Sequence, residues 1–258
     1  MSWLRAKCPA CRTLTAVAVG GGYECHSCGR EFQAGLVRVP RAWGNEGEQM
    51  AAAAYLDLPY PEAAVIAEDT LAEQTLALAA ALPERPLVLG GCCCAHIGVV
   101  EGLAARYGRI ALVWLDAHGD LNTSESSLSG NPWGMPLRML LDSGTVDVGD
   151  TILLGARNLD PPEEEFIAAS GLATHEDGLD ATLAGVEGVY VAFDVDVLEP
   201  ETGVVMFHPE RGGPTVAQAL ATLARLAPRS VVGAGFTGLT AAPTNVATLA
   251  RFSAALGL

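Results

Sequence analysis

The sequence predicts an α/β protein, with a three-layer α/β/α domain around a mostly parallel sheet and a small cysteine-rich module before it. Three observations lead to this fold class. Apolar segments of strand length alternate with segments of helical periodicity over most of the chain. Acidic residues follow directly on two of the apolar segments, and four of the seven cysteines form two C-x2-C pairs near the start.

Length and composition limit the possible functions. The 258 residues, half of them hydrophobic, suffice for one large α/β domain and a small module. A formal net charge of −15 argues against a protein whose whole surface binds nucleic acid; it would attract cationic small molecules, although solubility is the simpler explanation. The first residues are polar, and no apolar run reaches the ~20 residues of a membrane helix. We therefore expect a cytoplasmic protein with reduced thiols and no membrane partner.

The cysteine-rich module is expected to cover residues 1–35. Alternating apolar residues and a run of three glycines predict a hairpin that brings the two C-x2-C pairs together. Four thiolates at this spacing are typical of a structural zinc site and resemble a zinc ribbon; oxidised or metal-free cysteines are the alternative. The module could dock on the acidic body, contact a partner or touch nucleic acid, and the sequence leaves this open. The expected zinc ligands are Cys8, Cys11, Cys25 and Cys28.

The body, residues 36–258, is predicted from its alternation of strands and helices. Apolar runs of five to eight residues separated by helices favour a parallel sheet that is covered on both faces. Ligand sites in such sheets lie at the carboxyl ends of the strands. The expected strands lie within residues 85–91, 109–120, 151–157, 188–196 and 230–238. The expected helices cover residues 62–82, 95–108, 160–170, 215–227 and 245–256.

Two of these strands end in clusters of acidic residues. The stretch "LDAHGD" supplies Asp116, His118 and Asp120, and "FDVDVLEP" supplies Asp194 and Asp196. In an extended chain, residues two apart project from the same face, so each strand end could present its cluster in one direction. Converging carboxylates repel one another unless cations bind between them, and this donor set suits Mn²⁺. A single D-x-D motif is more often a turn or a cap; the two clusters together predict a metal site, with two ions about 3.5–4 Å apart if carboxylates are shared.

Four segments resemble signature blocks of the ureohydrolase (arginase/agmatinase) family. They are "LVLGGCCCAHIG", "WLDAHGDLNT", "ILLGARNLDPPEEEF" and "VAFDVDVLEPETG", the last followed by "HPERGG". The resemblance covers residues 36–258 and implies hydrolysis of a guanidinium-type carbon by a hydroxide that bridges two Mn²⁺ ions. By motif matching, Asp116 and Asp194 would bridge the ions. His118 and Asp196 would complete one metal site, Asp120 would belong to the other, and Asp120 or Asp196 could relay a proton.

The first block departs from the family pattern, which has a metal-binding histidine at the position of Cys93. A thiolate there would favour Zn²⁺ or Fe²⁺ over Mn²⁺. His96, one helical turn further, is an alternative ligand if the helix begins early. Cys93 could also be a nucleophile with His96 as its base. The simplest alternative is that Cys92, Cys93 and Cys94 pack as small hydrophobic side chains.

Two further departures concern the substrate. Trp133 stands where the family tends to carry a proton-transferring histidine; an indole does not titrate, so it would line the pocket or pack in the core. The family places a glutamate on the late strand to bind the guanidinium, but no acidic residue follows Glu210. Thr237 and Gly238 offer only a hydroxyl and backbone groups there. The resemblance therefore favours a substrate other than arginine itself.

Together these features predict a metal-dependent hydrolase of the ureohydrolase type. It would cleave a C–N bond of a guanidino, amidino or amide compound through a metal-bound hydroxide. Asn122, Thr123 and Trp133 are the expected substrate contacts, although the first two could belong to an ordinary polar loop. One alternative is a catalytically degenerate family member that binds or regulates a partner through its zinc ribbon. The other, a nucleic-acid binder led by the ribbon, is disfavoured because basic residues gather only in the small module. A homo-oligomer is compatible with either of the first two functions.

Overall fold

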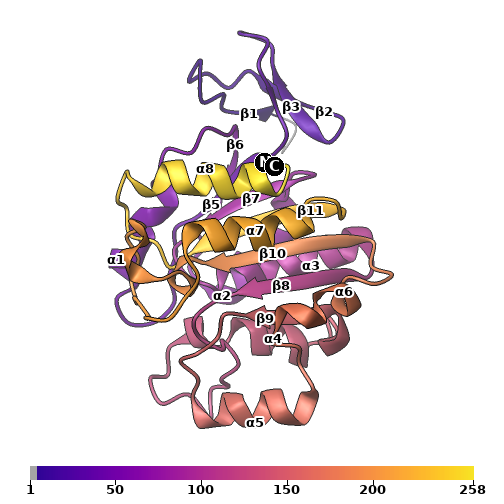
Figure 1. Ribbon diagram of the computed structural model, residues 1–258. Coiled ribbons are helices and arrows are strands. Elements are labelled where there is room, and N and C mark those ends of the chain that lie inside the picture. Colours follow the sequence, from indigo (N-terminus) through magenta and orange to yellow (C-terminus); the bar gives the residue numbers. More distant parts are fainter. Residues whose placement is uncertain (1–4) are drawn as a thin grey trace.

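The body of the protein is built on one parallel sheet (Figure 1). The computed structural model describes residues 5–258. Within them, the sheet has seven strands, in the order β6-β5-β7-β11-β10-β8-β9. In chain order these are β5 (Gly35–Val39), β6 (Glu62–Val65), β7 (Pro86–Gly90), β8 (Ile110–Leu115), β9 (Thr151–Leu154), β10 (Gly188–Asp194) and β11 (Val231–Thr237). Every neighbouring pair runs parallel, and all of these strands except the edge strand β6 are buried along their whole length.

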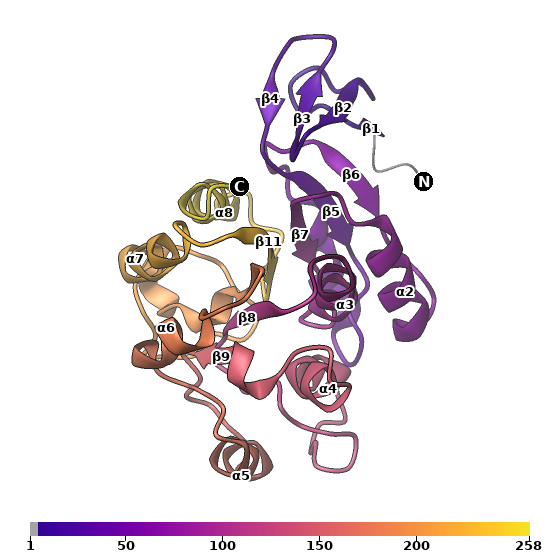
Figure 2. The ribbon, with the colours of Figure 1, turned by 90° about the vertical axis from the view of Figure 1, so that its right-hand side faces the viewer.

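Helices cover both faces of this sheet, which gives the three predicted layers (Figure 2). One face carries α2 (Leu71–Ala81), α3 (Ala95–Tyr107) and α4 (Pro136–Asp142). The opposite face carries α6 (Leu179–Thr182), α7 (Val216–Leu226) and α8 (Asn245–Ala255). Helix α5 (Pro161–Ser170) lies beyond the β9 edge, and α1 (Gly47–Ala51) precedes the edge strand β6 in the chain. The fold class predicted from the sequence is therefore confirmed.

Alternate residues of the central strand β10 pack into two different cores. Phe193 belongs to the core under α7 and α8, where its ring lies 5.9 Å from that of Phe236 and 4.9 Å from that of Phe252. Tyr190 belongs to the core under α2 and α3, together with Trp114 of β8. A two-residue period of this kind, apolar on both faces, is what a strand inside a three-layer protein requires.

Capping residues fix the ends of several helices, and short 3-10 helices lie in the connecting segments. Helix α5 begins with a capping box formed by Asp160 and Glu163, and α3 ends at Gly108, whose φ of 79° suits a glycine. No helix in residues 5–258 is long and apolar enough to span a membrane. The 3-10 helices are η1 (Ala52–Tyr55), η2 (Pro132–Gly134), η3 (Val148–Asp150), η4 (Glu176–Gly178), η5 (Val195–Val197) and η6 (Pro200–Thr202).

The expected helix over residues 62–82 is wrong in its first half. Residues Glu62–Val65 form β6, an edge strand, and the helix begins only at Leu71. Its start is fixed by Thr70, whose hydroxyl accepts a hydrogen bond from the backbone N–H of Glu73. An alanine-rich run is compatible with a strand or a helix. Here the segment is a strand because it pairs with β5. Strand β5 was not predicted either.

The N-terminal module forms its own antiparallel sheet, β1-β2-β3-β4. Its strands are β1 (Arg5–Ala6), β2 (Ala16–Val19), β3 (Gly22–Cys25) and β4 (Glu31–Phe32). The predicted hairpin is present, with Val19 opposite Gly22. Lys7 pairs antiparallel with Glu62, so the module attaches to the β6 edge of the large sheet (Figure 2). The first four residues of the predicted module, 1–35, lie outside the described part.

Candidate metal centre

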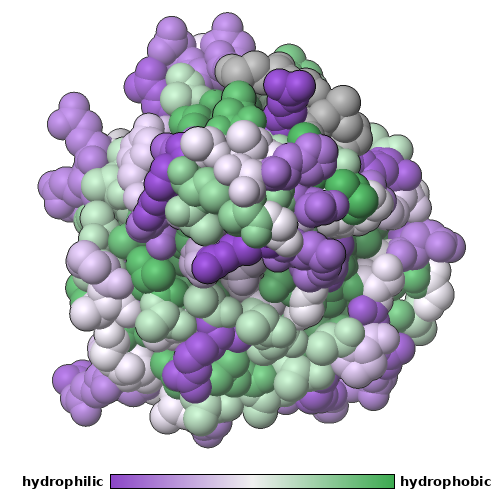
Figure 3. All heavy atoms as spheres, turned by 90° about the horizontal axis from the view of Figure 1, so that it is seen from above, coloured by the Kyte–Doolittle hydropathy of each residue, from purple (hydrophilic) through white to green (hydrophobic). Residues whose placement is uncertain are grey.

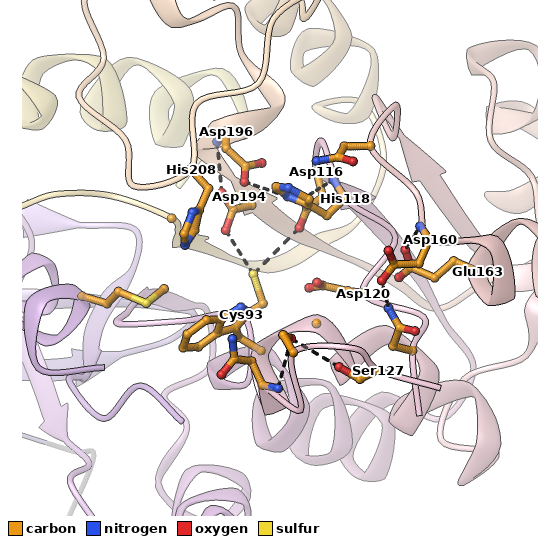
Figure 4. A pocket seen from close by; sticks show the side chains of 18 residues that line it. Cys93, Asp116, His118, Asp120, Ser127, Asp160, Glu163, Asp194, Asp196 and His208 are labelled. Carbon is orange, nitrogen blue, oxygen red and sulfur yellow. Dashed lines mark hydrogen bonds and ion pairs between the residues drawn. The ribbon is translucent and has the colours of Figure 1, made fainter. Parts of the chain in front are cut away.

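Three neighbouring strands end at one pocket of about 280 Å³ (Figure 4). Asp116 follows β8, Asp194 is the last residue of β10, and Thr237 is the last residue of β11. Asp194 lies opposite Thr237 in the register, and Cys93 reaches the same place from the turn between β7 and α3. The parallel topology therefore brings both predicted acidic clusters and the cysteine cluster to the carboxyl edge of the sheet.

Two groups of possible metal ligands meet at this edge. One consists of Asp116, His118 and Asp196, and the other of Cys93, Asp116 and Asp120. Within each group the ligand atoms lie no more than 4.8 Å from one another. Asp116 belongs to both groups, the arrangement expected of a carboxylate shared between two ions. His118 Nδ1 lies 3.0 Å from Asp196 Oδ2 and 3.4 Å from Asp116 Oδ1.

His118 and Asp120 serve different groups because the chain leaves the extended conformation after β8. Asp120 has a φ of 51°, in the left-handed region. The expectation that Asp116, His118 and Asp120 project together from an extended strand is therefore wrong. Asp120 is 4 % exposed, and its Oδ2 has no hydrogen-bond partner among residues 5–258. A buried carboxylate oxygen without a donor is unfavourable unless a cation lies against it.

Asp194 lies beside both groups and is held by three donors. Its Oδ2 accepts hydrogen bonds from Thr237 Oγ1 at 3.0 Å and from Cys93 Sγ at 3.1 Å. Its Oδ1 accepts one from the backbone N–H of Asp196 at 3.0 Å. Gly238, with a φ of 68°, packs so closely on this carboxylate that any side chain there would collide with it. The position of Asp194 is thus fixed by backbone as well as side-chain contacts.

The electrostatics of the cluster favour a bound cation. Burial, then the charge of Asp196, raises the pKa of Asp194 to about 7, and burial, then Asp116, raises the pKa of Asp196 to about 6. Burial and the neighbouring carboxylates Asp116 and Asp194 raise the pKa of Asp120 well above its usual value. Burial lowers the pKa of His118, but hydrogen bonds to Asp116 and Asp196 outweigh it and raise that pKa to about 12. With the unpartnered Oδ2 of Asp120, these residues fit hard or borderline divalent cations.

The cysteine cluster divides into one residue at the pocket and two in the core. Cys93 Sγ lies near Asp116 Oδ2 (3.9 Å) as well as Asp194, whereas Cys92 and Cys94 pack in the core under α3. Burial and nearby carboxylates raise the pKa of the Cys93 thiol well above its usual value, which argues against an activated nucleophile. His96 is fully buried beneath the pocket and bonds to Tyr190 and Thr237, so it does not replace the expected histidine ligand.

The predicted substrate contacts are only partly brought to the pocket. Trp133 and Asn122 line it, but the side-chain amide of Asn122 already donates to Asp160 Oδ2 at 2.9 Å and its oxygen accepts from Ser126. Thr123 instead closes a turn: its hydroxyl accepts from the backbone N–H groups of Glu125 and Ser126. In the described structure Thr123 lies outside the pocket lining.

Sequence reasoning missed three residues that shape the site. His208 lines the pocket, with its ring centroid 6.3 Å from that of Trp133. Glu163 lines it too, and accepts hydrogen bonds from the backbone N–H groups of Leu121 and Asp160. Arg157 donates to the backbone carbonyls of Gly155, Asp196, Val197, Glu210 and Arg211. His208 stands in "HPERGG", which entered the sequence analysis only as part of a segment that resembles a family block.

The N-terminal cysteines form a separate cluster. Sulfur atoms of all four lie within 4.8 Å of one another, with Cys8 Sγ and Cys28 Sγ 4.0 Å apart and Cys11 Sγ and Cys25 Sγ 4.0 Å apart. These distances are about twice the ~2.05 Å of a disulfide bond, and all four cysteines are free. Four sulfurs at ~2.3 Å from one zinc ion would be roughly 3.8 Å apart, so the cluster fits tetrahedral zinc.

The fold and the pocket define a three-layer α/β protein with a candidate two-metal centre at the carboxyl edge of its sheet. More specifically, the chain belongs to the Arginase family, whose sequence profile matches residues 34–250. The match begins after the four cysteines, so the N-terminal module lies outside it.

Individual relatives agree with this placement. The arginase of Bacillus subtilis (strain 168) is 34% identical over 154 residues, which is 50% of this chain and 52% of that protein. The chain thus matches about half the length of such curated relatives. The solved arginase from Bacillus caldovelox superposes with a TM-score of 0.76 at 25% identity, covering 86% of this chain and 97% of the other. Formimidoylglutamase from Bacillus subtilis subsp. subtilis str. 168 shares the fold, with a TM-score of 0.71, 17% identity and 87% coverage of both chains.

Proposed function

We propose that the chain is a metal-dependent hydrolase that cleaves a C–N bond of a guanidino, amidino or amide compound other than arginine. The observation that carries this proposal is the pair of ligand groups sharing Asp116 at the floor of a pocket. Family membership supports it, and so do the names of relatives: arginase, formimidoylglutamase and proclavaminate amidino hydrolase. Fold alone would not suffice, because one fold can host unrelated reactions.

Four aspartates, one histidine and one cysteine would hold two divalent ions, Mn²⁺ or another first-row metal. His118 and Asp196 complete one position, Cys93 and Asp120 the other, and Asp116 reaches both. Asp194 lies beside them as the second candidate for a shared ligand. When bound, two such ions polarise the substrate and lower the pKa of a water molecule.

The chain's own carboxylates are suited to move protons at this floor. Asp120 is a buried carboxylate that lines the pocket, so one of its oxygens can bind an ion while the other accepts a proton from a reacting group. Asp196 is engaged with His118 and with the backbone N–H of Ala117, so its role is mainly to orient the imidazole. We therefore assign proton relay first to Asp120 and second to Asp196.

Substrate selection follows from the pocket walls. The hydroxyl of Thr237 is committed to Asp194, so the end of β11 offers no free acceptor to a planar cation. Glu163 and Asp160 are likewise committed to backbone and amide donors at the start of α5. Trp133 and His208 present flat rings at the pocket instead. These walls favour a substrate with a flat or apolar body beside its amidino or amide group over arginine itself.

The cysteine cluster of the N-terminal module is proposed to hold one structural Zn²⁺. The module is tied to the body by the Lys7–Glu62 pairing and by an exposed ion pair between Arg12 and Asp57 at 2.7 Å. Viewed from this end, hydrophilic and hydrophobic residues are interspersed over the surface (Figure 3). The module would thus serve first to cover the β6 edge of the sheet.

The test is a substrate screen with metal-loaded protein. Guanidino, amidino, ureido and carboxamide compounds would be scored by release of ammonia, urea or amine. We expect turnover of an amidino or amide compound that Asp116→Asn reduces by at least about 10³-fold. Asp142→Asn is the matched control, because Asp142 forms an exposed ion pair with Arg138 on α4. Equal activity of Asp116→Asn and wild type would refute the mechanism, and fully metal-loaded protein without turnover would favour the catalytically degenerate alternative.

A further inference from the structure

We propose that the two metal positions are chemically unlike, and that the Cys93, Asp116 and Asp120 position takes a thiophilic divalent ion through the Cys93 thiolate. The His118, Asp116 and Asp196 position would keep an ion that prefers oxygen and nitrogen. The inference deepens the proposed function and rests on its two-metal centre. It concerns which ions this chain selects.

The two ligand groups differ in one donor. Each contains Asp116 and a second carboxylate, but one adds an imidazole and the other a sulfur atom. Thiolate ligands select Zn²⁺, Fe²⁺ or Co²⁺, whereas carboxylates and water suit Mn²⁺ and Mg²⁺. The two positions share Asp116 but differ in having an imidazole or a sulfur ligand. We therefore expect them to bind ions of two different elements.

Cys93 is held as a ligand would be held. Its Sγ lies 3.1 Å from Asp194 Oδ2 and 3.2 Å from Thr237 Oγ1. Thr237 Oγ1 in turn lies 3.4 Å from His96 Nε2. Cys92 instead contacts the side chain of Cys94 and the backbone of Trp43 in the core. The Cys93 thiol donates its proton to Asp194, and a bound cation would replace that proton between the sulfur and the carboxylate.

A glycine of β11 leaves room for the side chains that pack beneath Thr237. Gly235 of β11 lies against His96 and Tyr190, and a side chain at this position would approach Tyr190 Oη to 2.5 Å and the His96 ring to 2.8 Å. His96 and Tyr190 can therefore pack beneath Thr237 only because residue 235 is a glycine. Tyr190, His96 and Thr237 thus form a continuous series of contacts that ends at the Cys93 sulfur.

Asp120 provides an independent reason to expect an ion beside Cys93. Its Oδ2 is buried and has no donor in the described structure, although the oxygen belongs to a residue only 4 % exposed. Cys93 is 6 % exposed and Asp116 is 1 % exposed. Three buried ligands, one of them with an unpartnered oxygen, form a site that a cation would complete.

Cobalt reports the thiolate directly, because a Co²⁺–sulfur bond gives a charge-transfer band in the near ultraviolet. The full chain would be stripped of metal and then titrated with Co²⁺, so that both the N-terminal cysteines and the Cys93 position can take up cobalt. The difference spectrum between wild type and Cys93→Ser removes any contribution from the N-terminal module. We expect the band in wild type and in the control Cys92→Ser, and its loss in Cys93→Ser and Cys93→His.

Metal selectivity gives a second readout. With Zn²⁺ and Mn²⁺ in competition, Cys93→His should lower the bound Zn-to-Mn ratio of the body by at least about tenfold. X-ray absorption at the cobalt edge of the wild-type chain needs no variant, and remains decisive if the Cys93 variants do not fold. The number of sulfur neighbours of cobalt would be compared with that in a control that holds Co²⁺ only in the N-terminal module. Sulfur beyond the amount that the module accounts for supports the proposal.

The outcomes separate this inference from the proposed function. A cobalt shell with no sulfur beyond the share of the N-terminal module, or a near-ultraviolet spectrum unchanged in Cys93→Ser, overturns the thiolate position while hydrolysis could still be measured. A sulfur band with no turnover of any compound in the screen leaves the metal assignment intact and removes the hydrolase. Two Mn²⁺ ions bound with no preference for Zn²⁺ at either position also overturn the inference.

Discussion

His96 and Tyr190 form a hydrogen bond of 2.9 Å in the core directly beneath the candidate metal centre. Burial lowers the pKa of His96 to about 3, so its ring is neutral at physiological pH and carries one proton. Thr237 donates to Asp194 and must therefore accept from His96 Nε2, which leaves Nδ1 to accept from the Tyr190 hydroxyl. A directed chain of hydrogen bonds thus runs from the core to the carboxylate of Asp194.

Tyr190→Phe should destabilise the protein by about 1–3 kcal/mol, because it leaves the buried Nδ1 of His96 without a donor. Urea unfolding would measure the loss. Tyr107→Phe is the matched control, since the Tyr107 hydroxyl bonds an exposed backbone carbonyl, that of Glu84, at 3.3 Å. We expect the control to change the free energy of unfolding by less than about 0.5 kcal/mol. Equal effects of the two substitutions would show that the buried chain of hydrogen bonds has no special weight.

Arg157→Lys should both destabilise the chain and weaken metal binding. The Arg157 guanidinium donates to five backbone carbonyls, including that of Asp196 at 3.0 Å, and so joins three segments around the site. A lysine has one compact ammonium and cannot reach these acceptors together. We expect a loss of about 2–3 kcal/mol in unfolding free energy and a higher dissociation constant for the body metals.

Arg225→Lys serves as the control for this prediction. Arg225 forms an exposed ion pair with Glu176 at 2.7 Å, remote from the pocket, and such pairs contribute little. If both lysine variants bind metal as wild type does, Arg157 does not position Asp196. Isothermal titration with Mn²⁺ and denaturant unfolding would be measured on the same preparations.

The sequence predicted the centre of the fold better than its edge. Strands β7 to β11 are continuous apolar runs with charged residues only at their ends, a pattern that a parallel sheet buried on both faces requires. Strand β6 is alanine-rich and half exposed, so its period could not be distinguished from that of the helix that follows. Its conformation is set by pairing with β5, which lies far away in sequence.

The candidate site shows the same limit. Spacing placed Asp116, His118 and Asp196 correctly at strand ends, and the structure brings them together. The division between the two ligand groups was not derivable from spacing, because it depends on the left-handed conformation of Asp120. The burial of His96 depends likewise on the absence of a side chain at Gly235, on another strand.

One zinc ion per chain should depend on Cys28 but not on its neighbour His26. Cys28→Ser removes a sulfur from the N-terminal cluster, and a small module with little core needs the metal to fold. His26 is exposed and lies outside the cluster, so His26→Ala should retain the zinc. Metal analysis and limited proteolysis would test this: we expect rapid cleavage near residues 8–32 only in Cys28→Ser. Unchanged zinc content in that variant would contradict the assignment.

Alkaline pH should weaken the protein through Tyr23 of β3. Burial raises the pKa of Tyr23 to about 12, above the ~10 of an unfolded tyrosine. The native state therefore keeps its proton where the unfolded state has lost it, so this stability is present below about pH 10 and is lost as pH rises towards 12. Between about pH 10 and 11 the free energy of unfolding should fall by about 1 kcal/mol more in wild type than in Tyr23→Phe. Parallel pH profiles of the two proteins would contradict the prediction.

His208 should contribute to turnover if the chain is the hydrolase proposed above. Its imidazole ring lies at the pocket, with its centroid 6.3 Å from that of Trp133 and 6.2 Å from that of Phe207. The segment is held by a hydrogen bond from the backbone N–H of Phe207 to the carbonyl of Gly238. An imidazole fixed in this way can donate a proton to a leaving group, which the indole of Trp133 cannot.

His208→Phe keeps the ring and removes the proton. We expect kcat to fall by about 10²-fold or more while metal content and KM stay close to wild type. His175→Phe is the control, because His175 is exposed and lies on a different pocket of the molecule. A rise in KM with unchanged kcat would point to substrate packing, and unchanged kcat would exclude His208 from proton transfer. Trp133→His, which adds a second imidazole beside it, should then restore part of the rate in His208→Phe, since the proton could be supplied from the facing wall.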